Sequence, residues 1–340
     1  MRLLEPLAII YGGAVSARLG AYRRGLLKVR SAGRPVLSVG NIVAGGTGKT
    51  PFVRWLAREL LARGTRPSIL TRGYGRESRG SVVVSDGAGA LASVRASGDE
   101  AAVLARALPR VPIVADADRL AAARRVEALV PDVGVHLLDD GFSHVALARD
   151  LDVVLLDATC PDGGGALLPE GRLREPLASL ARADLVVVTK CEQADPAEAR
   201  ALANRWAPGA PVYHAVTRVL GIRDDAGTEV RPEDLPGQTL VAVAALARPE
   251  AFFATLEGLG IAPAGTLTFR DHHPYGSFAV GRIERAAEVA GASAVVTTEK
   301  DAIKLEGRTR LPLFRVAIEM AVTENDFVED ALRRLARPPS

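Results

Sequence analysis

One segment restricts the fold of this chain more than any other. Residues 36–50 read VLSVGNIVAGGTGKT, an apolar run that leads into a glycine-rich turn and ends in Lys49 and Thr50. Glycines allow successive backbone N–H groups to point at phosphate oxygens, and the N-terminus of a following helix adds a favourable potential. The segment therefore predicts a phosphate-binding loop (P-loop) between a buried strand and a helix.

The residue types in this loop predict separate roles in binding a nucleotide. Lys49 would pair with the β- and γ-phosphates, and the Thr50 hydroxyl would coordinate Mg²⁺, so ATP with Mg²⁺ is the expected ligand. Four residues would surround the phosphates: Gly45, Gly46, Thr47 and Gly48. The loop has Val43 where the commonest spacing has glycine, and Ala44 where partitioning-type ATPases have lysine.

Apolar runs of strand length recur along the chain, with Ala- and Arg-rich helical patterns between them. The clearest strand-like runs are Val36–Val39, Ser68–Leu70, Gly134–Leu138, Leu151–Leu156, Leu185–Thr189, Leu240–Ala244 and Ala294–Thr297. The clearest helical stretches are 51–63, 99–107 and 117–129. This alternation predicts an α/β fold of the P-loop NTPase type, in which helices cover both faces of a mostly parallel sheet.

A polar stretch interrupts this alternation at residues 216–239. It contains the turn signal Asp225–Ala226–Gly227 and ends in Pro236–Gly237. We expect a hairpin here that links a P-loop domain over residues 31–215 to a smaller C-terminal α/β domain over residues 240–340.

The first 30 residues combine an apolar run with a basic cluster. Residues 6–17 carry no charge but are too few to span a bilayer. The basic residues that follow are Arg18, Arg23, Arg24, Lys28 and Arg30. Such a segment can lie in an anionic membrane interface, or it can be an ordinary helix packed on the domain, and the residues alone leave both interpretations open.

Charge and cysteine content exclude several classes of partner. A formal net charge of +3 is too small to indicate a nucleic-acid-binding surface, so no nucleic-acid partner is expected. The two cysteines, Cys160 and Cys191, have neither a metal-ligand spacing nor the pattern of a disulfide framework, which favours a reducing compartment.

Two acidic pairs are candidates for the chemistry. Asp139 and Asp140 end an apolar run, and a carboxylate at the end of a strand beside the P-loop strand is where Mg²⁺ or its water shell is held; a plain Asp-Asp-Gly turn is the alternative. Asp99 and Glu100 begin a helical stretch, where acids are also favoured simply by the helix N-terminus.

Eight short motifs, in order over residues 36–305, make the chain similar to the tetraacyldisaccharide 4'-kinase family of Gram-negative bacteria. The motifs are SVGNIVAGGTGKTP, LTRGYGR, SGDE, LLDDGFSH, LPEGRLREP, VTKCE, FRDHHPY and VTTEKDAIKL. Departures from the family pattern fall at Ser143, Glu170, Arg172 and Gly276.

The resemblance implies a kinase that uses ATP and Mg²⁺ to phosphorylate the 4'-hydroxyl of a tetraacyl glucosamine disaccharide 1-phosphate. This reaction of lipid A biosynthesis takes place at the cytoplasmic face of the bacterial inner membrane. The enzyme would be peripheral, with the lipid acceptor and the membrane surface as its partners, and the apolar N-terminal segment over residues 1–30 would dock on the bilayer. The resemblance identifies no protein partner.

The resemblance also implies roles for individual residues. Asp99 would be the general base toward the sugar hydroxyl, Glu100 would lie near the metal, and His272 would reach the site from the second domain to partner Asp99. Residues that would contact the acceptor or the nucleotide phosphates are Arg72, Arg119, His144, Arg174 and Glu175. Lys49 would complete the catalytic set.

Two other classes of P-loop protein are alternatives. A GTPase is one, because Thr189–Lys190–Cys191–Glu192 imitates the guanine-binding motif, although Glu192 replaces its aspartate and Asp139–Asp140–Gly141 lacks the switch spacing. A membrane-associated partitioning-type ATPase is the other, and Ala44 in place of its signature lysine argues against it.

Overall fold

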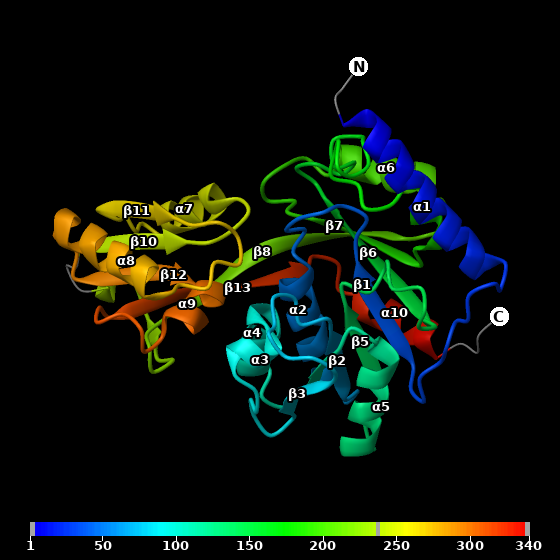
Figure 1. Cartoon of the computed structure of the whole chain (residues 1–340), viewed down its shortest axis with the longest axis horizontal. Coiled ribbons are helices and arrows are strands. Elements are labelled where there is room, and N and C mark those ends of the chain that lie inside the picture. The colour runs from blue at the N-terminus through cyan, green and yellow to red at the C-terminus, as the bar shows by residue number, and fades with distance from the viewer. Residues whose placement is uncertain (1–3, 236–238, 337–340) are drawn as a thin grey trace.

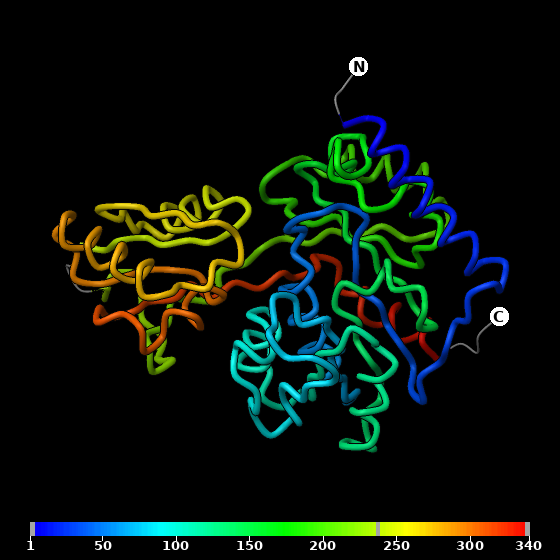
Figure 2. Tube along the Cα trace, in the orientation of Figure 1, coloured from blue at the N-terminus to red at the C-terminus, as the bar shows by residue number. Residues whose placement is uncertain are grey.

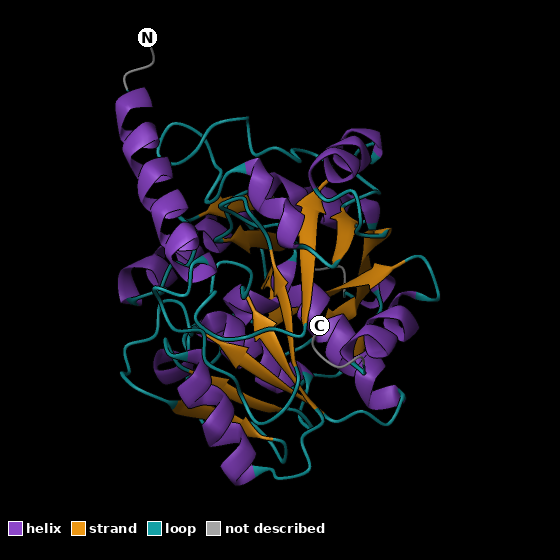
Figure 3. Ribbon diagram, turned by 90° about the vertical axis from the view of Figure 1, so that its right-hand side faces the viewer, coloured by secondary structure: helices purple, strands orange, loops and turns teal. Residues whose placement is uncertain are grey.

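The computed structural model describes residues 4–235 and 239–336, so the predicted Pro236–Gly237 turn and both chain ends lie outside the described residues. The molecule has two lobes (Figure 1), and one sheet of thirteen strands extends through the described part of both. Helices lie on both sides of this sheet (Figure 3). These features confirm the predicted α/β fold.

The strands divide between the lobes. The first lobe contains β1 (Val36–Gly40), β2 (Pro67–Thr71), β3 (Val82–Asp86), β4 (Pro112–Ala115), β5 (Val135–Asp139), β6 (Leu151–Asp157) and β7 (Leu185–Thr189). The second contains β9 (Glu229–Val230), β10 (Leu240–Ala244), β11 (Gly265–Thr268) and β12 (Ala294–Thr298), and the lobes share β8 (Val212–Arg223) and β13 (Leu313–Val322). The order is β11-β10-β12-β13-β8-β7-β6-β1-β5-β2-β4-β3, with β9 on β8. The seven strands expected from the sequence are all present, with ends shifted by one residue at most.

The helices follow the same division. The first lobe has α1 (Glu5–Arg23), α2 (Lys49–Ala62), α3 (Val94–Ser97), α4 (Asp99–Ala107), α5 (Arg119–Leu129), α6 (Ala197–Trp206), α10 (Phe327–Leu335) and a 3₁₀ turn at Leu177–Arg182. The second has α7 (Pro249–Gly258), α8 (Ser277–Ala290), α9 (Glu299–Leu305) and a 3₁₀ turn at Pro232–Asp234. The three expected helices correspond to α2, α4 and α5.

The central strands of the first lobe are buried on both faces, as parallel strands between helix layers must be. β1, β5, β6 and β7 are buried at every position. Residues from α2, α4 and α10 pack with one face of the sheet, and residues from α5 and α6 pack with the other. The apolar runs are thus buried on both faces, and β1 lies between β5 and β6 in the first lobe's part of the sheet.

Two long strands join the lobes (Figure 2). β8 runs parallel to β7 at residues 212–214 and antiparallel to β13 from Ala215 to Arg223. The predicted linker over 216–239 therefore begins inside β8, and β8 then forms a short hairpin with β9. β13 crosses back from the second lobe and brings α10 into the core of the first.

The C-terminal helix shows that the lobes are not consecutive segments of sequence. The Phe327 ring of α10 lies 5.8 Å from the ring of Phe52 and 5.7 Å from that of Trp55, both on α2, and 5.1 Å from that of Tyr213. The sequence-based division placed these C-terminal residues in a domain over 240–340, whereas the structure packs them under the P-loop helix.

Candidate active site

The P-loop occupies residues 41–48, between β1 and α2. Its Asn41 side chain donates to the Val43 carbonyl (2.7 Å) and to Thr47 Oγ1 (2.9 Å), and it accepts from Lys49 Nζ (3.2 Å). Gly48 has φ 84°, a backbone conformation that other residues rarely adopt, so glycine is favoured there. Gly45 and Gly46 remain exposed.

Residues at the ends of β6 and β7 hold this loop in place. Thr189 donates its hydroxyl to the Thr47 carbonyl (3.2 Å), and Lys190 Nζ donates to the Gly46 carbonyl (2.8 Å). Lys190 also pairs with Asp157 Oδ2 at 2.5 Å. The stretch that imitates a guanine-binding motif thus braces the P-loop, a role that the sequence did not reveal although the motif itself was visible.

A carboxylate pair borders the P-loop lysine at the end of β5. Asp140 lies 2.9 Å from Arg174 and 3.5 Å from Lys49. Burial works to raise the pKa of Asp140, but the charges of Lys49 and Arg174 outweigh it and lower that pKa. Asp139 is buried, and its burial together with the charges of Glu100 and Asp140 raises its pKa to about 7. Three of the four predicted metal-binding residues therefore influence one another.

Asp99 and His272 meet across the two lobes. Asp99 is the first residue of α4 and is buried, and His272 Nδ1 lies 3.0 Å and 3.1 Å from its two carboxylate oxygens. Burial works to raise the pKa of Asp99, but the hydrogen bond with His272 and the charges of Lys300 and Lys304 lower it to about 2. The same hydrogen bond raises the pKa of His272. The exposed Tyr74 ring lies 4.9 Å from the imidazole.

Helix α9 of the second lobe supplies two lysines to this pair. Lys300 Nζ lies 3.1 Å from His272 Nε2 and 3.8 Å from Glu100 Oε1, and Lys304 Nζ lies 3.4 Å from Asp99 Oδ2. Both belong to the motif VTTEKDAIKL, yet the sequence alone gave them no role. Lys49 thus pairs with Asp140, the charges of Asp140 and Glu100 act on Asp139, and Lys300 joins Glu100 to the Asp99–His272 pair.

The other predicted contact residues have different environments. Arg72 is exposed and forms no ion pair with another described residue, whereas Arg119 is buried and donates to the Asp116 carbonyl (2.9 Å). Burial lowers the pKa of His144 to about 4. Glu175 is buried and pairs with Arg182 at 2.5 Å, so it is held by a cation of the 3₁₀ turn that follows it. Thr50 is half-buried in the first turn of α2.

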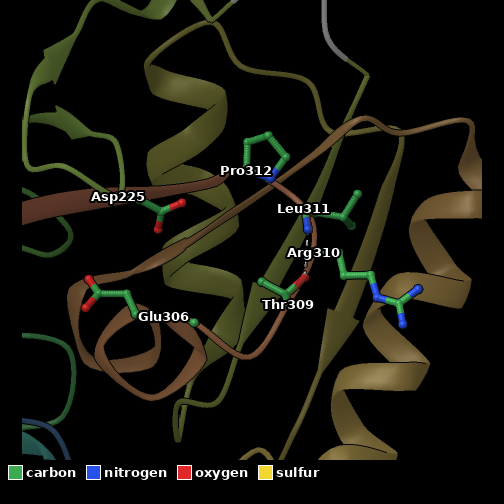
Figure 4. A pocket seen from close by; sticks show the side chains of 7 residues that line it. Asp225, Glu306, Thr309, Arg310, Leu311 and Pro312 are labelled. Carbon is green, nitrogen blue, oxygen red and sulfur yellow. Dashed lines mark hydrogen bonds between the residues drawn. The ribbon is translucent and has the colours of Figure 1, made fainter.

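A separate hollow of about 600 Å³ lies in the second lobe (Figure 4). It is lined by Asp225, Glu306, Gly307, Thr309, Arg310, Leu311 and Pro312. Of its two acidic residues, Glu306 is already paired with Arg106 and Arg315. Because none of the predicted site residues lines it, we place the candidate active site at the P-loop.

The outer edge of the first lobe carries α1 (Figure 1). Only Ala8 and Gly12 of this helix are buried, while Leu7, Ile9 and Ile10 are 53%, 68% and 68% exposed. Among the helices that the structure describes, none has the length and apolar character needed to cross a membrane.

The sequence and the fold are similar to those of known proteins. A family model described as tetraacyldisaccharide-1-P 4'-kinase matches residues 1–337. A tetraacyldisaccharide 4'-kinase of Geobacter metallireducens is 42% identical over 98% of both chains. One of Anaeromyxobacter sp. strain K is 44% identical over 95% of this chain and 87% of its own. The crystal structure of an "apo" form LpxK from Aquifex aeolicus in complex with ATP is 31% identical over 98% of both chains, with a TM-score of 0.82.

Proposed function

Since the chain belongs to the tetraacyldisaccharide-1-P 4'-kinase family, we propose that it transfers the γ-phosphate of ATP to the 4'-hydroxyl of a tetraacyldisaccharide 1-phosphate. The observation that carries the proposal is the contact of 3.0 Å between Asp99 of the P-loop lobe and His272 of the second lobe. A GTPase or partitioning-type ATPase has no need of such a pair from a second lobe.

The carboxylates at the end of β5 and the start of α4 suit Mg²⁺ as a ligand. The charges of Asp140 and Glu100 oppose the ionisation of Asp139, and a divalent cation would relieve that repulsion. Together with the Thr50 hydroxyl these residues would hold the ion, with the ATP phosphates and water completing its coordination. When bound, Mg²⁺ neutralises negative charge on the phosphates.

Lys49 supplies the cation on the other side of the phosphates. Its ammonium, held by Asn41 and Asp140, stands at the start of α2, where the backbone N–H groups of the P-loop also point. Phosphoryl transfer depends mainly on positioning and charge stabilisation. Lys49 and the exposed glycines would therefore orient the γ-phosphate, and Arg174 would extend the positive edge next to Asp140.

Asp99 and His272 act as a unit toward the acceptor hydroxyl. Asp99, the proposed general base, stays ionised because its pKa is about 2, so its carboxylate takes the proton that the hydroxyl loses. His272 Nδ1 donates to the same carboxylate, a contact that raises the pKa of His272 and holds Asp99 in place. A hydroxyl loses its proton late in such a transfer, so a weak base in the right place is sufficient. Closure of the two lobes is then a catalytic requirement.

The acceptor would contact cations around the loops of the first lobe. Arg72, exposed and without an ion-pair partner in the described chain, suits a phosphate group of the acceptor. Arg119, at the start of α5, is close enough to His144 for its charge to act on the imidazole, and burial keeps His144 neutral near pH 7. Glu175 would support the 172–176 segment through its ion pair with Arg182, beside the contact with the acceptor or nucleotide that we expect of it.

The acceptor would be met at a membrane surface, through the exposed apolar side chains of α1. This helix contacts the active-site loops, because Tyr11 donates its hydroxyl to the Arg174 carbonyl (2.9 Å) and Arg18 donates to the Ser143 carbonyl (2.8 Å). A helix of this kind lies in the interface and is not inserted across it. The cytoplasmic face of the bacterial inner membrane, with the protein bound peripherally, is the proposed location.

The proposal is tested by transfer of label from γ-labelled ATP to purified tetraacyldisaccharide 1-phosphate in detergent micelles with Mg²⁺. We expect a labelled lipid that disappears in Lys49→Ala. Hydrolysis of ATP or GTP that proceeds without lipid, and no labelled lipid, would contradict the proposal and favour a switch ATPase or GTPase.

A further inference from the structure

Lysine is rare in this chain. The five lysines among its 43 lysine and arginine residues are Lys28, Lys49, Lys190, Lys300 and Lys304. Four of them contact the P-loop or the Asp99–His272 pair. A lysine offers a compact ammonium with three donors, whereas an arginine offers a planar fork, so a site that needs one cation among several oxygens favours lysine. Lys304 is the most buried cation of this set.

Lys304 is held from within the second lobe. Its Nζ lies 3.4 Å from Asp301 Oδ1 and 5.4 Å from the centroid of the Tyr275 ring. Asp301 is fully buried, and its Oδ2 accepts from the Ala245 backbone N–H (2.9 Å) and from the Thr298 hydroxyl (2.9 Å). The position of the ammonium is therefore fixed by the end of β10 and the start of α9.

The same ammonium reaches the first lobe. Lys304 Nζ lies 3.4 Å from Asp99 Oδ2, and this carboxylate is contacted from another side by His272 Nδ1 at 3.0 Å. A buried carboxylate needs charged or hydrogen-bonding partners, and the directions of these partners determine its orientation. Lys304 is buried behind Asp99, so it acts on the site through Asp99 and does not face the acceptor.

We propose that Lys304 is a positioning residue for phosphoryl transfer, and that its ammonium, seated on Asp301, fixes the Asp99 carboxylate for its contact with His272. Docking of α9 against α4 thereby assembles the pair when the lobes meet. This inference rests on the proposed kinase function and adds to it a residue that acts through Asp99.

The test compares kcat, the KM for ATP and ATP binding in the full-length protein and in Lys304→Met. We expect kcat to fall about 100-fold, the effect of misplacing a reacting group, with the KM and the Kd for ATP changed less than about twofold. Lys304→Arg keeps the charge and is expected to recover part of kcat. Arg285→Met, which removes an exposed cation of α8 that pairs with Glu288, is the control and should match the wild type.

A double-mutant cycle separates positioning from general destabilisation. In an Asp99→Asn background, Lys304→Met should change kcat less than about twofold, because the group on which it acts is no longer a carboxylate. If Lys304→Met fails to fold, as judged by its Tm and by ATP titration, the same cycle is run with Lys304→Gln, which keeps a polar end.

An unchanged kcat in Lys304→Met, or an equal loss in both Asp99 backgrounds, would overturn the inference. The wild-type protein is measured first: if it transfers no phosphate to the lipid, the proposed function fails and this inference fails with it, whereas a normal wild type with a normal Lys304→Met refutes only the role of Lys304.

Discussion

The two lobes contribute to the site in different ways. In the first lobe the functional groups come from one local unit, the strand β1, the P-loop and the helix α2, with the carboxylates of the neighbouring strand β5 beside them. In the second lobe no nucleotide-binding unit is formed by the described residues, and the contribution is a loop with His272 and a helix with two lysines. We propose that the first lobe binds the nucleotide and that the second completes the site for transfer.

The largest effects are expected from substitution of Lys49 and Asp99 in the first lobe, and they distinguish nucleotide binding from phosphate transfer. Lys49→Ala should lower turnover about 10³-fold and also weaken ATP binding, because the ammonium touches the phosphates in both the ground state and the transition state. Asp99→Ala should lower turnover similarly and leave ATP affinity unchanged. Turnover in micelles and nucleotide titration measure both quantities. Near-normal turnover in either variant would remove that residue from the mechanism.

The core under the P-loop gives the next effect and tests whether α10 belongs to the first lobe. Phe327→Ala removes a fully buried ring that contacts Phe52, Trp55 and Tyr213, and it should lower the free energy of unfolding by about 3–5 kcal/mol. Phe278→Ala, on α8 of the second lobe, is the matched control because that ring is 82% exposed. Urea denaturation measures both. Equal losses in the two variants would mean that α10 does not hold the P-loop helix in place.

The raised pKa of Asp139 predicts an effect of pH on the stability of the protein in the absence of nucleotide and Mg²⁺. Because Asp139 has a raised pKa, the folded state keeps a proton that the unfolded state releases above pH 4, so its contribution to stability is present at low pH and is lost as the pH rises toward about 7. Asp139→Asn should therefore raise the Tm by a few degrees at pH 8 and change it little at pH 4. A Tm difference that does not vary with pH would contradict this account of the site.

Substitutions in helix α1 are expected to have the smallest effect, and they should not change the packing of either lobe. Ile9→Ser with Ile10→Ser should weaken binding to vesicles that contain anionic lipid by about tenfold or more, since each 1.4 kcal/mol of lost burial is a factor of ten. ATP binding should not change. Sedimentation with vesicles measures the effect, and Val289→Ser, at another exposed apolar residue far from α1 in the sequence, is the control. Unchanged sedimentation of the double variant would exclude α1 as the membrane contact.

The sequence predicts best what is local. The P-loop and the seven apolar strands have signals within a few residues of one another, and all of them are found in the structure. β13 was missed because Arg315 and Glu319 interrupt its apolar run, and these charges are tolerated only through pairing with Glu306 and Arg58, residues distant in sequence or in another element. The place of α10 was missed for the same reason, since only β13 carries it across to the first lobe.

The second lobe's part of the site was predicted only through the family resemblance. Asp99 and His272 are 173 residues apart, and nothing in the loop around His272 reveals its partner. The left-handed backbone of His272, with φ 58°, aims its ring and has no signature in the sequence. Lys300 and Lys304 had one signal that composition could have provided, the scarcity of lysine in a chain whose other cations are nearly all arginine.

The most direct test of the two-lobe account is His272→Ala, assayed for ATP affinity and for phosphate transfer to the lipid acceptor. The account predicts that the Kd for ATP stays within about twofold of the wild type while kcat falls by about 10²-fold or more, the usual contribution of a positioned acid or base. Near-normal transfer would contradict it, because the second lobe would then have no part in the chemistry.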